Sequence, residues 1–296
     1  MLALLILVFT LAACGDDSPV PEADGTLPPV STSPGTTPGD TSGDNGGRTY
    51  EVRKGADDVV ISVSREGGFV PVEMIFANTP TALVTGDGRV LSTGPVVAIY
   101  PGPLLPNIQQ RSISPAGVQA LLAKADELGL LGNVEYAGND RVADAPDTVV
   151  TIAVDGEVYT HRAYALEIEG PGTEDDPARA NLAEFVAAMS DLPSTVGDSE
   201  LGPEEPFETD QYLIRATPAD PEAAATEGIE PTVVPWPADA PVRLADAAEC
   251  APVPVATFEP LFADATTLTF FTEPGPDGAE VAYQVTPVPQ FPGRTC

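Results

Sequence analysis

A tract that cannot fold by itself occupies residues 15–48 and confines any globular structure to the residues that follow it. Of its 34 residues, 22 are Gly, Pro, Ser or Thr, six are acidic and one is basic. So few large apolar side chains cannot offset the conformational entropy that folding would cost. We therefore expect a disordered tether with a root-mean-square span of about 30–35 Å and a fully stretched length of about 110 Å.

An apolar run from Leu2 to Ala13 precedes the tether and leads directly into Cys14. A helix that spans a bilayer needs roughly 20 residues, so this shorter run has the length of an export signal. Its end, Leu11-Ala12-Ala13-Cys14, resembles the lipobox signal peptide of bacterial lipoproteins, and the resemblance covers residues 1–14 only. It implies cleavage of residues 1–13 and a diacylglycerol thioether on Cys14. Acyl chains such as palmitate would then hold the protein on the extracytoplasmic face of the cell membrane.

The first residues of this signal depart from the pattern, because Met1-Leu2-Ala3 carries no basic side chain. Export signals begin with a positively charged segment, so we expect the true translation start to lie upstream. The alternative interpretation is a buried core segment that happens to end in a cysteine.

The folded part carries a large excess of negative charge. The chain has 45 acidic against 13 basic residues, which gives a formal net charge of −32. Nucleic acid is therefore excluded as a partner, since binding to it depends on cationic groups. Docking on anionic lipid is disfavoured for the same reason, so the predicted membrane link is covalent. The acids are dispersed, which favours a solvated surface over the alternative of affinity for Ca²⁺ or a cationic partner.

A break in composition around Pro193, Gly197 and Pro203 indicates a boundary within the folded part. About 250 residues follow the tether, enough for one large or two modest domains. We predict an α+β domain over residues 49–197 and a smaller C-terminal subdomain over residues 198–296.

Hairpins and two helices account for the first region. Gly86-Asp87-Gly88, whose glycines we expect to supply positive φ, and Asp155-Gly156 each join a pair of strand-like runs. Ser114 and Asp176, each followed by Pro, indicate the starts of two amphipathic helices. Long parallel crossovers are absent, so the fold class is α+β, with an antiparallel sheet packed on one face by the two helices. The expected strands cover residues 59–64, 81–85, 89–93, 108–113, 148–154 and 157–164.

The C-terminal subdomain has weaker signals, typical of an α+β or mostly β structure. Residues 211–216 predict a strand and residues 255–263 a short helix. Residues 266–272 and 280–286 predict a hairpin across a turn rich in Gly and Pro. Fewer than a hundred residues can bury only a thin core.

Cys250 and Cys296 are the cysteines that remain once Cys14 is lipidated. In an exported protein an even remainder predicts a disulfide, and closing a loop of about 47 residues would stabilise the fold by about 4 kcal/mol. The prolines of segment 287–293 cannot donate regular ladder hydrogen bonds. We therefore expect this bond, more than core burial, to hold the subdomain together. Two reactive thiols or a metal pair are the alternative.

Sequence motifs of catalysis are missing from the chain, which has no nucleophile elbow, phosphate-binding loop, Cys-x-x-Cys or His-Glu-x-x-His. His161, the one histidine, alternates with Tyr159 along a predicted strand, and no nucleophile lies beside it in the sequence. We interpret both as structural residues, with a role in binding as the alternative. Hydrolysis through two carboxylates stays open as well, because spacing along the chain does not report the distance between acids.

Asp140, Asp144, Asp147 and Trp236 have both a functional and a structural interpretation. The three aspartates could offer oxygen ligands to Ca²⁺, but their spacing matches no EF-hand loop, so we predict neither metal nor cofactor. Trp236 lies in a proline-rich stretch that presents the indole at low entropic cost. It either recognises a partner or forms a strap over the subdomain's core, and we expect the strap.

These features predict a membrane-anchored extracytoplasmic lipoprotein of the cell envelope, a non-enzymatic binding module for an unidentified envelope protein or ligand. The alternative is an envelope hydrolase that acts through carboxylates, with or without calcium. A third interpretation is an inhibitor or sensor of another envelope protein, which would show a protruding loop or an exposed apolar patch. A pocket that gathers carboxylates with His161 or Tyr159 would favour the hydrolase, and a filled surface there would favour binding.

Overall fold

The computed structural model describes residues 48–139, 141–168, 176–225 and 228–296. Cys14, the predicted tether and Asp140 therefore lie outside the described residues. Residues 46–296 form one compact unit that contains two β-sheets and several helices, which confirms the predicted α+β class. The division of this unit at residue 197 stays a prediction. No helix in the described part is both long and apolar enough to cross a bilayer.

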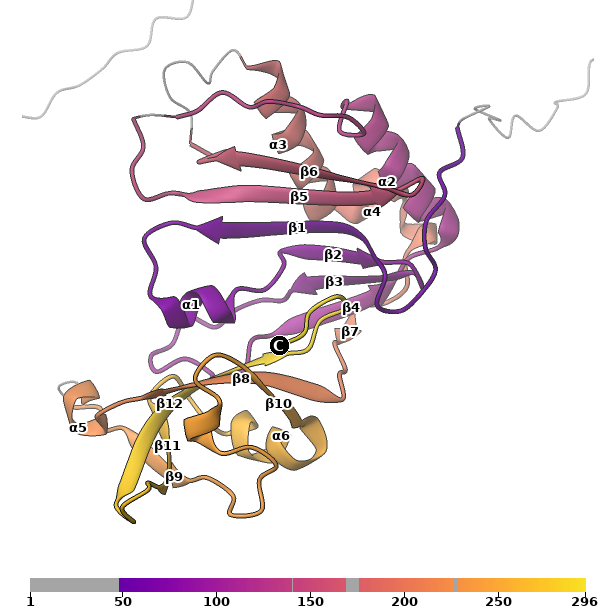
Figure 1. Cartoon of the computed structure of the whole chain (residues 1–296). Helices are drawn as coiled ribbons and strands as arrows, with labels where there is room; N and C mark the ends of the chain where they lie inside the picture. The colour runs from indigo at the N-terminus through magenta and orange to yellow at the C-terminus, as the bar shows by residue number, and fades with distance from the viewer. Residues whose placement is uncertain (1–47, 140, 169–175, 226–227) are drawn as a thin grey trace, which may run out of the picture. The chain divides into compact units, whose positions relative to one another are not determined.

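The first sheet has seven strands, each antiparallel to its neighbours, in the order β6-β5-β1-β2-β3-β4-β7. Helices α2 (Pro115–Glu127) and α3 (Pro177–Ser190) lie against one face of it (Figure 1). Their apolar side chains form one core with residues of the strands, and among them Leu121, Phe185 and Ile152 are fully buried. The strands are β1 (Val59–Gly67), β2 (Ala82–Thr85), β3 (Arg89–Thr93), β4 (Ile108–Ser112), β5 (Pro146–Val154), β6 (Glu157–Tyr164) and β7 (Glu205–Pro206).

Both helices begin at the capping residues that the sequence indicates. The Ser114 hydroxyl accepts a hydrogen bond from the Gly117 N–H at 3.1 Å, and the Asp176 carboxylate accepts one from the Ala178 N–H at 2.9 Å. Each bond satisfies a backbone donor that has no partner within its helix. Just past the end of α2, Gly129 has a φ of 74°, a conformation that costs glycine nothing.

The turn between β2 and β3 needs both of its glycines, for different reasons. Gly88 has a φ of 84°, as predicted. Gly86 does not have a positive φ; a Cβ there would lie 1.9 Å from the Arg53 carbonyl oxygen, so the approach of another backbone segment excludes a side chain. The prediction of a positive φ was therefore correct for Gly88 and wrong for Gly86.

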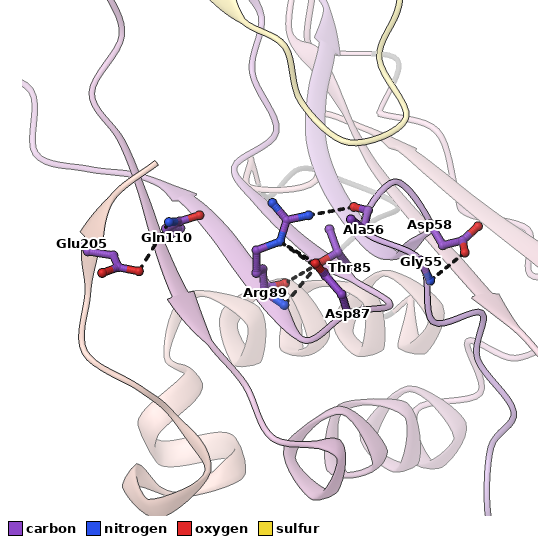
Figure 2. Close-up of polar contacts among 8 residues, drawn as sticks. All are labelled: Gly55, Ala56, Asp58, Thr85, Asp87, Arg89, Gln110 and Glu205. Carbon is purple, nitrogen blue, oxygen red and sulfur yellow. Dashed lines mark hydrogen bonds and ion pairs between the residues drawn. The ribbon is translucent and has the colours of Figure 1, made fainter. Parts of the chain in front are cut away.

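Side-chain contacts fix this turn and the edge of the sheet beyond it (Figure 2). The Arg89 guanidinium binds the Asp87 carboxylate at 2.9 Å and donates to the Ala56 carbonyl oxygen at 2.8 Å. It thereby ties the turn to the segment that precedes β1. On the edge, the Gln110 amide of β4 donates to the Glu205 carboxylate of β7 at 3.4 Å.

The second sheet has five strands in the order β10-β8-β12-β11-β9, of which β9 and β11 run parallel and the other pairs antiparallel. Helix α6 (Val255–Ala263), with the predicted bounds, buries Phe258 and Phe262 in a core that also contains Trp236 and Phe271. Tyr212 and Tyr283 are buried in the same core, so that six large aromatic side chains fill it. The strands are β8 (Gln211–Pro218), β9 (Thr232–Pro235), β10 (Ala251–Pro254), β11 (Thr269–Pro274) and β12 (Glu280–Pro289).

The last strand extends beyond its predicted end at residue 286, although the added residues include Pro287 and Pro289. Strand β12 continues to Pro289 and pairs with β8 along its last residues. The Gln290 N–H donates to the Gln211 carbonyl oxygen at 3.0 Å, so alternate residues face β8. Pro287 and Pro289 therefore direct their nitrogen atoms to the other side, where β11 no longer pairs with β12. Proline is tolerated at such an edge because no donor is needed there.

The predicted disulfide joins Cys250 and Cys296, with a Cα–Cα distance of 5.4 Å. Noncovalent contacts hold the residues before it as well. Phe291 stacks on Phe207, with ring centroids 5.8 Å apart, and packs with Leu83 in a small cluster on the first sheet. The C-terminal segment is therefore held by packing in addition to the covalent bond.

Eight short elements were not expected from the sequence, because segments of two to six residues are too short to show a periodic pattern. They are the strands β7, β9 and β10 and the helical elements α1 (Val72–Ala77), α4 (Leu192–Val196), η1 (Asp198–Glu200), α5 (Pro221–Ala224) and η2 (Leu244–Asp246).

Candidate interaction surface

His161 is buried in the core and has no path to a ligand, since only 1% of its surface is exposed. Its Nε2 lies 2.8 Å from the Leu130 carbonyl oxygen and its Nδ1 lies 2.7 Å from the Tyr136 hydroxyl. A carbonyl can only accept, so Nε2 carries the proton and Nδ1 accepts from Tyr136. Burial lowers the pKa of His161 and raises the pKa of Tyr136 to about 12, which keeps both groups neutral. Tyr159 is half-buried against the same core.

The candidate calcium ligands have structural contacts of their own. The Asp147 carboxylate binds the Arg162 guanidinium at 2.8 Å. The Asp144 carbonyl oxygen accepts a hydrogen bond from the Phe69 N–H at 3.3 Å, and Asp144 itself has a φ of 62°. Asp140 lies outside the described residues. Among the residues that the structure describes, no three His, Cys, Asp or Glu side chains form a group that could hold a metal ion.

Trp236 lies in the core of the second sheet, where 7% of its surface is exposed. Its ring centroid is 4.7 Å from that of Phe258, and its Nε1–H donates to the Val242 carbonyl oxygen at 2.9 Å. The indole ring is thus packed and its N–H is hydrogen-bonded within the fold, which fits the strap interpretation.

The surface that stands out is an apolar rim at one end of the first sheet. Eleven large apolar side chains among the described residues are exposed, and eight of them lie in two loops. One loop joins β1 to β2 and the other joins β3 to β4. We define the apolar rim as these eight residues: Phe69, Val70, Met74, Ile75, Val96, Val97, Ile99 and Tyr100.

Strand direction brings the two loops to the same end of the sheet. Because β1, β2 and β3 alternate in direction, the last residues of β1 and of β3 lie at one end, as Figure 1 shows. Only β2 separates these strands, so their axes are about 10 Å apart. The turn at Asp155-Gly156 and the first described residue, Arg48, lie at the opposite end, where Arg48 binds the Asp155 carboxylate at 2.8 Å.

The loop that contains α1 is held by backbone conformation and by the C-terminal segment. Gly67 and Gly68 have φ values of 75° and 80°, which turn the chain away from β1. Arg294 donates to the carbonyl oxygens of Phe76 and Asn78, and its guanidinium lies 5.2 Å from the centre of the Phe76 ring. A residue near the C-terminus therefore fixes the position of α1 and of the rim residues on it.

The second loop is tied to the other sheet at its far end. The Leu104 N–H donates to the Ala265 carbonyl oxygen at 3.0 Å, and the Thr267 N–H donates to the Gly102 carbonyl oxygen at 2.9 Å. At its base, the Gly94 N–H donates to a carbonyl oxygen on the returning chain at 2.8 Å. Val96, Val97, Ile99 and Tyr100 nevertheless remain 56–75% exposed, so these contacts present the apolar side chains without covering them.

A hollow of about 850 Å³ lies behind the first loop. Its apolar lining includes Phe69 and Ile75, and its charged lining includes Arg65, Glu66 and Arg162. Glu66 is bound to Arg162, and neither His161 nor Tyr159 lines the hollow. The carboxylates of this hollow are therefore not assembled with the residues that the hydrolase interpretation requires.

Sequence reasoning missed the apolar rim, although a signal for it was available. Residues 90–110 form a run of 21 residues without one charged side chain, and residues 67–81 contain a single charge, Glu73. Such runs are conspicuous in a chain with a net charge of −32.

No family model, no curated protein and no solved structure matches this chain.

Proposed function

We propose that this protein is a membrane-anchored extracytoplasmic lipoprotein that acts as a non-enzymatic binding module of the cell envelope, and that the apolar rim is its contact face. One observation carries the proposal, namely the concentration of eight of eleven exposed large apolar side chains in two loops at one end of the sheet. Soluble proteins rarely leave such a patch uncovered unless it binds something.

The burial of the candidate site residues and the net charge support a hydrophobic contact over catalysis. His161 is enclosed and neutral, and Trp236 is in a core, so neither can meet a substrate. The proposed contact is hydrophobic, which agrees with a net charge of −32 that repels nucleic acid and anionic lipid. Attachment to the membrane is assigned to a lipid on Cys14, on the resemblance of Leu11-Ala12-Ala13-Cys14 to a lipobox.

Site-specific photocrosslinking in cells that produce the protein tests the contact face. A photoreactive benzoylphenylalanine in place of Ile99, which is 63% exposed, should yield adducts with envelope components. The matched control is the same group in place of Val158, which is 65% exposed but lies beside the Asp155-Gly156 turn at the opposite end of the sheet. Equal adduct yields at the two positions, or no adduct at Ile99, would contradict the proposal.

The anchor needs a separate test. The parent, expressed from the genomic context, should incorporate radiolabelled palmitate, and the Cys14→Ser variant should not. Equal labelling of the variant and the parent would exclude lipidation of Cys14.

A further inference from the structure

We infer that the apolar rim inserts into the interfacial layer of the same lipid bilayer that holds the anchor, so that the protein contacts the membrane at two places. This inference rests on the proposed function, because it names the surface that the rim binds. Two observations support a lipid surface over a protein partner, namely the exposure of the rim side chains and the lack of charge in the two loops, and the length of the predicted tether permits the contact.

Many of the rim side chains extend into solvent, including those on the loop from β3 to β4, which do not line the hollow behind the first loop. Phe69 is 88% exposed, Val96 75%, Ile99 63% and Tyr100 61%. A protein partner would need a complementary cavity for each protrusion, whereas the interfacial layer of a bilayer accepts apolar groups of any shape to a depth of about 5–10 Å. Aromatic residues such as Phe69 and Tyr100 are enriched at this depth in membrane proteins.

The two loops of the apolar rim contribute almost no charge that would oppose contact with a bilayer. With a net charge of −32, most faces of the protein are repelled by anionic headgroups. Residues 90–110 carry no charge and residues 67–81 carry only Glu73, so the two loops themselves add little to this repulsion. Glu66, which lines the hollow beside the rim, is paired with Arg162. Hydrophobic insertion there requires no basic residues, and neither loop contains one.

The predicted tether can bring the rim to the bilayer although it joins the fold at the opposite end. Cys14 precedes Arg48 by 34 residues, which span at most about 110–120 Å. The nine residues of β1 that separate the two ends of the sheet span about 30 Å. Anchoring also raises the local concentration of the rim at the membrane to the millimolar range, so a contact too weak to recruit a free protein would still be populated.

Fluorescence quenching on the full lipidated chain, reconstituted in phosphatidylcholine vesicles, tests the inference. Trp236 is the one tryptophan and is buried, so it contributes a constant background. A Tyr100→Trp variant adds a reporter on the rim, and a Val158→Trp variant adds the matched reporter at the opposite end of the sheet. With brominated acyl chains in the vesicles, the added fluorescence of Tyr100→Trp should be quenched severalfold more than that of Val158→Trp.

Two further measurements separate the effect of the rim side chains from the effect of the anchor. Adding Phe69→Ser and Ile99→Ser to the Tyr100→Trp chain should abolish the excess quenching, whereas adding Val233→Ser, which removes an exposed apolar side chain outside the rim, should not. Flotation of the vesicles reports the anchor independently. Protein that floats but shows equal quenching at both positions overturns the lipid contact and leaves the anchored binding module standing, with a protein as the occupant of the rim. Protein that does not float overturns the anchor and this inference with it.

Discussion

Replacing Trp236 by alanine should destabilise the fold more than most single substitutions. The indole lies in the core of the second sheet, with ring centroids 4.7 Å from Phe258, 5.8 Å from Phe271 and 6.2 Å from Phe262. Deleting a buried Trp side chain costs about 3–5 kcal/mol, because transfer free energy is lost and a cavity remains. Part of that cost, about 1 kcal/mol, is the hydrogen bond from Nε1–H to the Val242 carbonyl oxygen.

Urea unfolding followed by far-ultraviolet circular dichroism measures this loss without relying on the deleted fluorophore. The urea concentration at the unfolding midpoint should be lower in Trp236→Ala than in the parent. The slope of the free energy of unfolding against urea should be unchanged, since unfolding exposes nearly the same surface area in both proteins. The matched control is Trp236→Phe, which keeps much of the packing and should lose about 1–2 kcal/mol. A loss below about 1 kcal/mol in Trp236→Ala would refute the core position of the indole and revive its interpretation as an exposed binding residue.

Three more predictions concern residues that hold the fold in place. Burial lowers the pKa of His161 below its unfolded value of about 6.5. As the pH falls below that value the unfolded state gains a proton before the folded state does, so stability is complete above about pH 6.5 and declines toward acid. Urea unfolding of His161→Gln should therefore show a smaller decline between about pH 7 and pH 5 than the parent, and equal declines would contradict this assignment. Exchanging Cys250 and Cys296 for serine should lower the free energy of unfolding by about 4 kcal/mol, because the unfolded chain gains conformational entropy. Amide protection in β12 should remain, because β12 is paired with β8 to Pro289. Loss of that protection would mean that the disulfide alone holds the strand. Arg294→Ala removes the hydrogen bonds to the carbonyl oxygens of Phe76 and Asn78, so it should lower the free energy of local opening of α1 by about 1–2 kcal/mol. Faster amide exchange over residues 72–77 would measure this loss. Unchanged exchange there would show that the C-terminal segment does not position the rim.

Local signals in the sequence predicted the elements that depend on one or two residues. Ser114 and Asp176 cap their helices, and Asp155 and Gly156 have φ values of 54° and 83°, as a two-residue hairpin turn requires. The disulfide followed from the two cysteines that remain when Cys14 is set aside on its resemblance to a lipobox cysteine. These predictions succeed because the determining interaction lies within a few residues or is covalent.

Features that depend on tertiary neighbours were missed or misinterpreted. The prolines at Pro287 and Pro289 are compatible with β12 because β11 does not extend beside them, and strand lengths of partners cannot be read from the sequence. Gly86 is required by the Arg53 carbonyl oxygen, 33 positions earlier in the chain. The apolar rim arises because strand order brings two separate loops to one end, and nothing within either loop reveals that arrangement.

Hydrogen exchange measured by mass spectrometry tests the proposal that the apolar rim is the contact face of an anchored binding module. The comparison is between the lipidated chain in native envelope vesicles and the Cys14→Ser chain free in solution. We predict slower exchange over residues 67–81 and 94–107 in the vesicles and unchanged exchange around the turn at Asp155-Gly156. Unchanged exchange in both loops, or protection confined to the turn at the opposite end, would contradict the account.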